Sequence, residues 1–85
     1  MININIRQLQ YIVAVSEQKS FEKAAEACFV TQSTLSTMVG RLEKELNIIL
    51  FDRKTKPIEI TKEGQEIIIQ ARTILQEMQN LEQIA

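Results

Sequence analysis

The chain has 85 residues, of which 45% are hydrophobic and 25% charged, as in an ordinary single globular domain. One cysteine and no histidine exclude a disulfide framework and a zinc cluster, and leave few of the usual catalytic groups. No apolar run approaches the roughly 18 residues that span a membrane, and residues 1–7 lack the pattern of a signal peptide. We therefore expect a soluble, cytoplasmic protein that is not an enzyme and needs no metal or cofactor.

The net charge of −1 is distributed unevenly along the chain. Residues 1–62 hold nine Lys and Arg against seven Asp and Glu, a net charge of +2. Residues 63–85 hold Arg72 against four glutamates, a net charge of −3. Such an asymmetry is more informative than the total. Because phosphate repels the acidic segment, any contact with nucleic acid is expected from the first three-quarters of the chain.

Cap residues and apolar spacing predict three helices in the first half of the chain, over about residues 6–18, 21–27 and 32–46. Each is preceded by a side chain suited to cap it: Asn5, Ser20 and Thr31. Asn5 is also followed three residues later by Gln8, which is the pattern of a capping box. The third helix has one apolar stripe, formed by Leu35, Val39, Leu42 and Leu46. The opposite face of that helix is therefore expected to be exposed.

A short helix, a turn and a longer amphipathic helix form a helix-turn-helix, which we place at about residues 20–42. The exposed face of the second of these helices is rich in short hydrogen-bonding groups: Gln32, Ser33, Thr34, Ser36 and Thr37. Its first acid is Glu43. Gln, Ser and Thr all bond to base edges in the major groove of DNA. The alternative is that these residues only cap the helix and face solvent.

Two short runs of strand character, residues 50–53 and 58–61, flank a basic turn and predict a β-hairpin at about 50–61. The turn carries three cations: Arg53, Lys54 and Lys56. Beside a helix-turn-helix, such a hairpin is interpreted as a wing whose cations bind phosphates. The alternative is an ordinary charged turn that keeps an edge strand soluble.

The last quarter of the chain predicts one long helix, capped by Thr61. Apolar residues recur there at spacings of 4, 3, 4, 3 and 4: Ile67, Ala71, Ile74, Met78, Leu81 and Ala85. This is the spacing of a dimerisation seam. We expect the early turns to pack on their own domain and the part beyond Leu75 to pair with a second copy, although a helix packed wholly on its own domain is the alternative. The seam runs to the last residue, so a fragment of a longer protein is expected.

Two isolated residues have a structural and a functional interpretation. Cys28 lies between two predicted helices among small and apolar neighbours, which favours a buried small hydrophobe over a redox group. Gly40 lies on the outer face of the third helix, where a glycine costs about 1 kcal/mol relative to alanine. It either gives clearance to a DNA backbone or is a neutral surface residue.

Five motifs in this order resemble the N-terminal DNA-binding domain of LysR-type transcriptional regulators: Ala24-Ala25, then residues 30–36 (VTQSTLS), 41–46 (RLEKEL), 50–53 (LFDR) and 60–64 (ITKEG). The resemblance implies a mainly α fold, with a winged helix-turn-helix in residues 1–61 and a linker and dimerisation helix in residues 62–85. It also implies a bacterial regulator that binds a pseudo-palindromic site on double-stranded DNA as a homodimer, or as a tetramer in the full-length protein. The domain that binds a small-molecule effector would lie outside this chain.

The resemblance also assigns roles to single residues. It places Gln32, Ser33, Ser36 and Thr37 at base edges. It places Ser20, Thr31, Arg53, Lys54 and Lys56 at phosphates, and Arg41 is a further backbone candidate. This chain departs from the family at two positions, because Thr37 stands where Arg or Lys is common and Ser33 stands where proline is frequent. The alternative function is a helical module for protein interaction or dimerisation that does not bind DNA.

Overall fold

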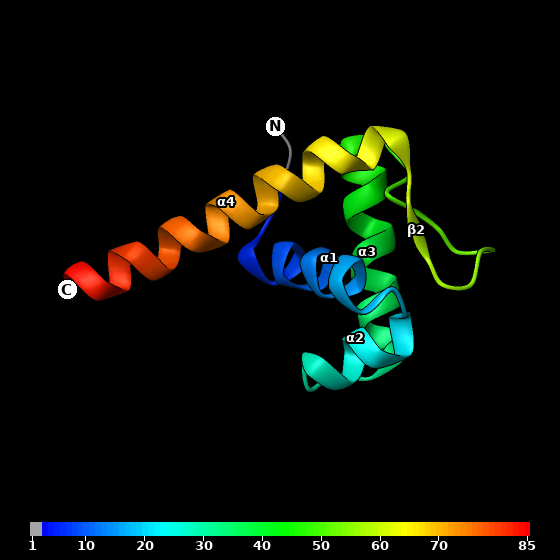
Figure 1. Cartoon of the computed structure of the whole chain (residues 1–85), viewed down its shortest axis with the longest axis horizontal. Helices are drawn as coiled ribbons and strands as arrows, with labels where there is room; N and C mark the ends of the chain where they lie inside the picture. Colours follow the sequence, from blue (N-terminus) through cyan, green and yellow to red (C-terminus); the bar gives the residue numbers. More distant parts are fainter. Residues whose placement is uncertain (1–2) are drawn as a thin grey trace.

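The computed structural model describes residues 3–85, which form four helices and one two-stranded sheet (Figure 1). The elements in chain order are α1 (Ile6–Gln18), α2 (Phe21–Ala27), α3 (Gln32–Leu46), β1 (Phe51–Asp52), β2 (Glu59–Ile60) and α4 (Lys62–Ile84). The strands are antiparallel, with Phe51 opposite Ile60. The predicted mainly helical winged helix-turn-helix is confirmed, with helix bounds close to those expected from the sequence.

Every helix begins at the cap that the sequence predicts. The backbone N–H groups of Gln8 and Asn5 each donate to the other residue's side chain, at 2.9 and 3.0 Å, which completes the capping box of α1. The hydroxyl oxygens of the other three caps accept a hydrogen bond from the backbone N–H three residues later. These caps are Ser20, Thr31 and Thr61. Local side-chain chemistry therefore sets the helix starts.

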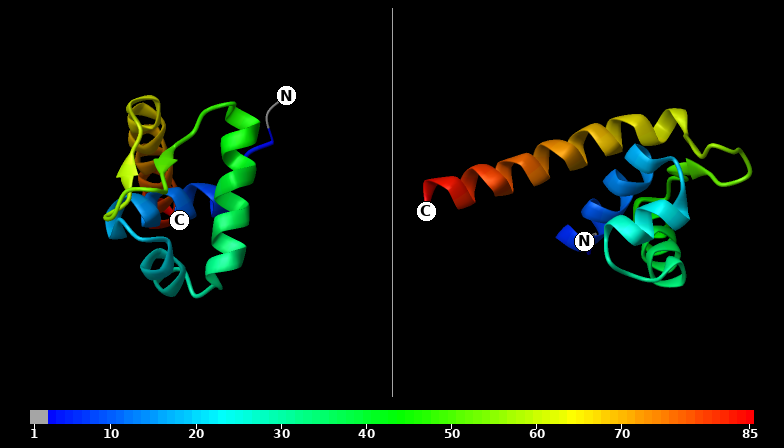
Figure 2. Two further views of the ribbon diagram at one scale, coloured as in Figure 1. Left: turned by 90° about the vertical axis from the view of Figure 1, so that its right-hand side faces the viewer. Right: turned by 60° about the horizontal axis from the view of Figure 1, so that its bottom comes forward.

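One hydrophobic core unites α1, α2, α3, the start of the wing and the first half of α4. The predicted stripe of α3 lies in this core, with Leu35, Val39 and Leu42 fully buried. The Phe21 and Phe51 rings meet edge to face at 6.0 Å and connect α2 with β1. Figure 2 shows α1 between α3 and α4, so the helices cross rather than form a parallel bundle. Because the apolar stripe of α3 packs into the core, the opposite face of this helix is exposed.

The first three turns of α4 lie on α1 and belong to the core. Ile68 is buried, and Ala71 is only 1% exposed. Ala71 therefore has no surface left for a second chain, which corrects its predicted place in the dimer seam. Ile67 is also half-buried against the core. The exposed part of the seam begins at Ile74.

A buried carboxylate connects the end of α3 to the wing. Asn47 ends α3 in the left-handed conformation, with φ of 56°, which asparagine tolerates well. The chain then turns so that the Glu43 carboxylate accepts hydrogen bonds from the backbone N–H of Leu50 at 2.7 Å and of Phe51 at 3.4 Å. Glu43 is the first acidic residue of α3, and its side chain is buried rather than exposed to solvent.

The tip of the wing is fixed at two points. The Ile58 N–H donates to the Lys19 carbonyl oxygen at 3.0 Å, which ties the hairpin to the turn between α1 and α2. The Asp52 carboxylate accepts a hydrogen bond from the Lys54 N–H at 3.0 Å at the start of the tip. The Lys56–Pro57 peptide bond is cis. The Ile58–Lys19 bond brings the basic tip to the start of α2, where Lys56 lines a hollow shared with α3.

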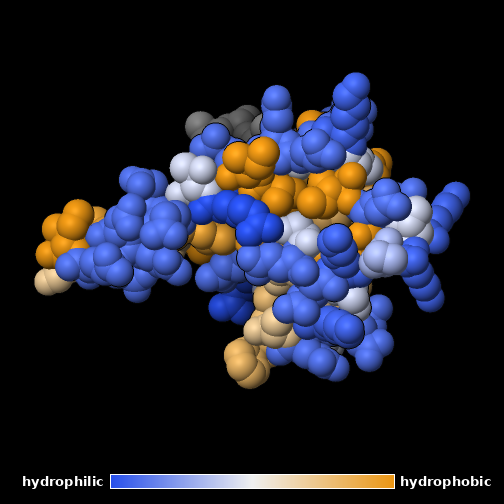
Figure 3. All heavy atoms as spheres, viewed as in Figure 1, coloured by the Kyte–Doolittle hydropathy of each residue, from blue (hydrophilic) through white to orange (hydrophobic). Residues whose placement is uncertain are grey.

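The second half of α4 extends beyond the body of the molecule (Figure 1). With this helix included, the molecule measures 42 × 29 × 19 Å. Large apolar side chains are exposed along this half: Ile74, Met78, Leu81 and Ile84. Figure 3 shows apolar atoms gathered at its free end. Among residues 3–85, no helix is both long and apolar enough to cross a membrane.

The two glycines are expected to respond in opposite ways to alanine substitution. A Cβ on Gly64 would lie 2.8 Å from the Leu50 carbonyl oxygen, whereas a Cβ on Gly40 would meet only the Arg53 guanidinium, at 4.0 Å. Gly64→Ala should therefore lower the free energy of unfolding by about 1–3 kcal/mol, the range for an overpacked site. Gly40→Ala should raise it by up to about 1 kcal/mol through helix propensity. Urea titrations measure both, and equal shifts would contradict the close approach at Gly64.

Removing the Glu43 carboxylate should destabilise the domain. Glu43→Ala would leave the Leu50 and Phe51 N–H groups without their acceptor, at a cost of about 1–3 kcal/mol. The control is Glu66→Ala on the exposed side of α4, where about 0.5 kcal/mol or less is expected. Thermal unfolding followed by circular dichroism compares the two. A similar small effect for both variants would show that the joint between α3 and the wing does not depend on Glu43.

Candidate nucleic-acid interface

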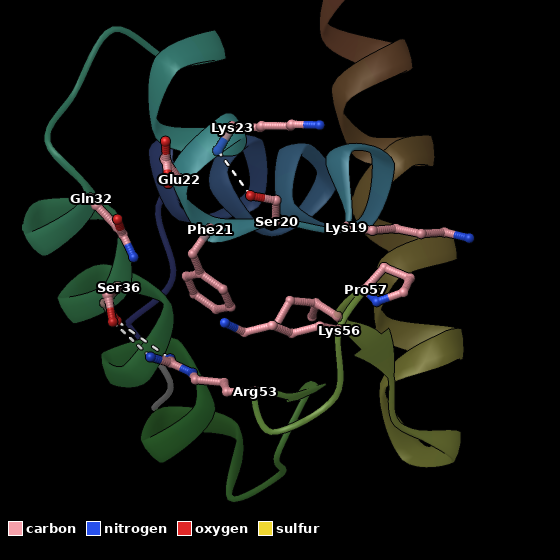
Figure 4. A pocket seen from close by; sticks show the side chains of 11 residues that line it. Lys19, Ser20, Phe21, Glu22, Lys23, Gln32, Ser36, Arg53, Lys56 and Pro57 are labelled. Atoms are coloured by element: carbon pink, nitrogen blue, oxygen red, sulfur yellow. Dashed lines mark hydrogen bonds between the residues drawn. The ribbon is translucent and has the colours of Figure 1, made fainter.

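A hollow of about 500 Å³ opens between the start of α2, the first half of α3 and the wing (Figure 4). Four cations line it, from three different parts of the chain: Lys19, Lys23, Arg53 and Lys56. Neutral polar groups share the lining: Ser20, Gln32 and Ser36. Glu22 is the one acid among the lining residues of this hollow. Such a lining suits a polyanion, because the cations can bind its charges and the neutral groups can hydrogen-bond to its other polar atoms.

The face of α3 that the sequence predicts to be exposed does face solvent. Gln32, Ser33 and Thr37 are exposed, while Ser36 is half-buried on the wall of the hollow. Thr34 is also exposed, but its hydroxyl accepts a hydrogen bond from Thr31 at 2.9 Å. Residues 32–40 contain no charged side chain, so the first two turns of α3 present neutral donors and acceptors to a ligand.

Arg53 lies across the hollow with its guanidinium turned toward α3. Nη1 donates to Ser36 Oγ at 2.6 Å, and Nη2 lies 3.4 Å from a carboxylate oxygen of Glu43. The guanidinium carbon lies 4.4 Å above the centre of the Phe21 ring. The Arg53 side chain keeps 40% of its surface exposed. Arg53 therefore joins wing and helix and still presents positive charge to the hollow.

The other predicted phosphate contacts divide into two groups. Ser20 and Lys56 line the hollow, and Lys54 is exposed beside it on the wing. Arg41 instead lines a separate hollow at the start of α1, together with Asn5 and other residues. Ser20 and Thr31 use their hydroxyl oxygens as helix caps. The structure thus brings together the wing and the start of α2 but leaves Arg41 apart.

Two cations of the hollow are absent from the sequence-based set of contacts. Lys19 directly precedes the cap of α2, and Lys23 follows it by one turn, so both flank Ser20. The position of two lysines around a predicted cap is the sequence signal for these contacts. It indicates a phosphate site only when the wing is known to lie opposite, because the Ile58–Lys19 backbone bond brings the two segments together.

Cys28 lies outside this hollow, at the end of α2. Its side chain is half-buried against the core. Burial raises the pKa of the Cys28 thiol above its ordinary value. A raised pKa disfavours the reactive thiolate, in keeping with the predicted role of a small hydrophobe.

Comparison with known proteins agrees with this geometry. Residues 6–65 match the family model of bacterial regulatory helix-turn-helix proteins of the lysR family. A hydrogen peroxide-inducible genes activator of Haemophilus influenzae is 45% identical over 82 residues, which cover 96% of this chain and 27% of that protein. The DNA-binding transcriptional dual regulator OxyR of Escherichia coli is 40% identical over 82 residues, with the same coverage. This chain thus spans about a quarter of these curated relatives.

A solved structure supports the same assignment in three dimensions. The DNA-binding domain of BenM, described in complex with benA site 1 DNA, superposes with a TM-score of 0.92 at 34% identity. The match covers 95% of this chain and 91% of that one. With the family model matched over residues 6–65, this chain belongs to the LysR family of bacterial regulatory helix-turn-helix proteins.

Proposed function

We propose that this chain is the DNA-binding part of a bacterial transcription regulator that acts in the cytoplasm and recognises a specific sequence in double-stranded DNA. One observation carries the proposal: a cation-lined hollow opens beside the neutral polar face of α3, between that helix and the wing. The domain of BenM that shares this fold is described in complex with DNA. The rest of the protein, outside this chain, would bind the small-molecule effector.

Base selection is assigned to the exposed start of α3. Gln32 can bond adenine through two atoms, and the hydroxyls of Ser33, Ser36 and Thr37 can bond several base edges. The first three of these residues lie within four positions of the start of α3, the end of a recognition helix that enters the major groove. Thr37 brings no cation, so this helix lacks a candidate bidentate contact to guanine at that position.

Affinity is assigned to charges that surround α3. Lys19, Lys23, Lys54 and Lys56 lie on or beside the hollow, and the hydroxyl of Ser20 adds a neutral phosphate contact. The Thr31 hydroxyl donates to Thr34 at 2.9 Å and would have to release that bond to donate to a phosphate. Arg53 uses three N–H donations on Ser36 and Glu43, which leaves two of its five for a phosphate. Arg41, at the other side of α3, would reach the backbone on a neighbouring turn of DNA.

Dimerisation is assigned to the second half of α4. Ile74, Met78 and Leu81 recur at the seam spacing, and Leu81 is 67% exposed. Ile84 adds a further exposed apolar group at the end of the helix. A second copy paired along this stripe would cover it and present two α3 helices to a roughly palindromic site. A tetramer would need contacts from the rest of the protein.

Duplex binding should fall steeply with salt. Four or five phosphate contacts for each chain predict a slope of about −4 for each bound chain, or about −8 for a bound dimer, in log affinity against log salt concentration. Lys23→Ala should reduce the steepness by about one unit for each bound chain and weaken all sequences alike. Arg7→Ala, on the exposed side of α1, should leave the slope unchanged. A duplex selected from a random pool should bind more tightly than its scrambled form. A flat salt response would instead favour a module for protein interaction.

Leu81→Lys should shift the protein from dimer to monomer. The substitution places a charge on the exposed apolar stripe, which a partner helix would have to bury. Gln79→Lys adds the same charge on a different face of α4 and serves as the control. Sedimentation equilibrium over a concentration series measures the change. If both variants associate as the parent does, the distal stripe is not the dimer contact.

A further inference from the structure

The Ser36 hydroxyl acts as an acceptor within the protein. Arg53 Nη1 lies 2.6 Å from Ser36 Oγ, the shortest distance in the contacts of this arginine. The guanidinium has no acceptor of its own, so the direction of this hydrogen bond is fixed: the arginine donates and the serine accepts. A charged donor makes the bond stronger than one between neutral groups.

Arg53 is itself held in place from three sides. Its Nη2 pairs with Glu43 at 3.4 Å and lies 3.5 Å from the Ser36 carbonyl oxygen. Its guanidinium covers the Phe21 ring. Glu43 is in turn fixed by the Leu50 and Phe51 N–H groups. The donor that meets Ser36 Oγ is therefore part of the packed joint between α3 and the wing, rather than a mobile surface side chain.

The hydroxyl hydrogen of Ser36 remains available. Helical serines and threonines commonly donate to a carbonyl one turn earlier. Thr73 does so here, to Ile69 at 3.2 Å, and Ser16 does so, to Val13 at 2.7 Å, while it also accepts from Arg72 at 3.0 Å. Within residues 3–85, Ser36 Oγ makes no corresponding donation, and its recorded side-chain bond is the one from Arg53. The side chain lines the hollow together with Gln32 (Figure 4).

We propose that Arg53 is a positioning residue that fixes the Ser36 hydroxyl as a donor toward the bound duplex. The inference rests on the proposed DNA binding. A serine hydroxyl has one hydrogen and two lone pairs. The bond from Arg53 occupies one lone pair with a cationic donor, which makes a second donor less favourable and the hydroxyl hydrogen a stronger donor, so an acceptor in the ligand is favoured. Purine N7, guanine O6, thymine O4 and phosphate oxygens qualify, and the amino group of cytosine does not. Arg53 would thus influence sequence preference through a side chain other than its own.

Without Arg53, Ser36 regains the freedom of an ordinary helical serine. Its hydroxyl can then turn to donate to the carbonyl of its own helix, as Thr73 does, or accept from a donor in the duplex. The contribution of the hydroxyl to binding should therefore depend on residue 53. A simple phosphate contact by Arg53 would create no such dependence, because its loss would add to the loss of Ser36.

The test is a double-mutant cycle with Ser36→Ala and Arg53→Met, on a duplex selected for tight binding by the 85-residue chain. Affinity is measured by fluorescence anisotropy at one salt concentration. Ser36→Ala should weaken binding by about 3- to 10-fold when Arg53 is present, the range for one hydrogen bond. In the Arg53→Met background, this loss should disappear. Arg53→Lys keeps both the charge and the donors, so part of the loss should return with it.

Two controls separate positioning from general effects. Ser33→Ala makes the same change at an exposed serine of α3, and its cost should be equal in both backgrounds. Lys54→Met removes one wing cation and should leave the cost of Ser36→Ala unchanged. Thermal unfolding is recorded for each variant. If Arg53→Met does not fold, the cycle is run with Arg53→Lys, for which a partial loss of coupling is expected.

The duplex identifies which acceptor is used. If it is a base, turning one base pair so that cytosine faces Ser36 should remove the contribution of the hydroxyl. If it is a phosphate, a single methylphosphonate should remove it on every sequence. An equal cost of Ser36→Ala in both backgrounds, or a preference for cytosine at that position, would overturn the positioning role and leave DNA binding intact. Failure of the parent chain to bind any duplex would instead overturn the proposed function.

Discussion

The buried carboxylate of Glu43 is the constraint on which the interface depends. A sheet of two residues per strand has too few backbone hydrogen bonds to be stable alone. Its position is set by contacts with the helices: the two N–H groups bound by Glu43, the Phe21–Phe51 ring contact and the bond from Ile58 to Lys19. These contacts fix the wing against α3, so the width of the hollow between them is built into the fold.

The same carboxylate carries a negative charge close to the cation-lined hollow. Arg53 offsets it at 3.4 Å, so the negative charge does not face the hollow unaccompanied. A pair of this kind adds little stability where it is exposed, and Arg53 is partly exposed. Its value lies in geometry, because it fixes a guanidinium against Ser36 and Phe21. The Arg53 side chain thus both joins the wing to α3 and orients a polar group on that helix.

The sequence predicts the elements well because their signals are local. Asn5, Ser20, Thr31 and Thr61 each cap a helix through a bond three residues away. The apolar stripe of α3 also depends only on spacing within one helix. Local signals of this kind do not need the tertiary fold, so the helix bounds and the exposed face of α3 could be found without it.

The sequence does not predict contacts between segments that are far apart in the chain. Glu43 looks like the first acid of a solvated face, yet it is buried because the chain turns back at Asn47 and supplies two N–H groups. Ala71 fits the seam spacing, yet α1 covers it because α4 crosses the body at that turn. Lys19 and Lys23 become part of the hollow only because the wing lies opposite them.

The division of charge between elements has a further consequence for recognition. Because residues 32–40 of α3 have no charged side chain, the positive charge of the hollow comes from the α1–α2 turn, α2 and the wing. Cations on phosphates set affinity and its dependence on salt, whereas neutral groups at base edges set sequence preference. Under the proposed function, separate elements would carry the two properties, so a change in one could leave the other intact. Arg53 is the exception, since it comes from the wing and contacts a serine of α3.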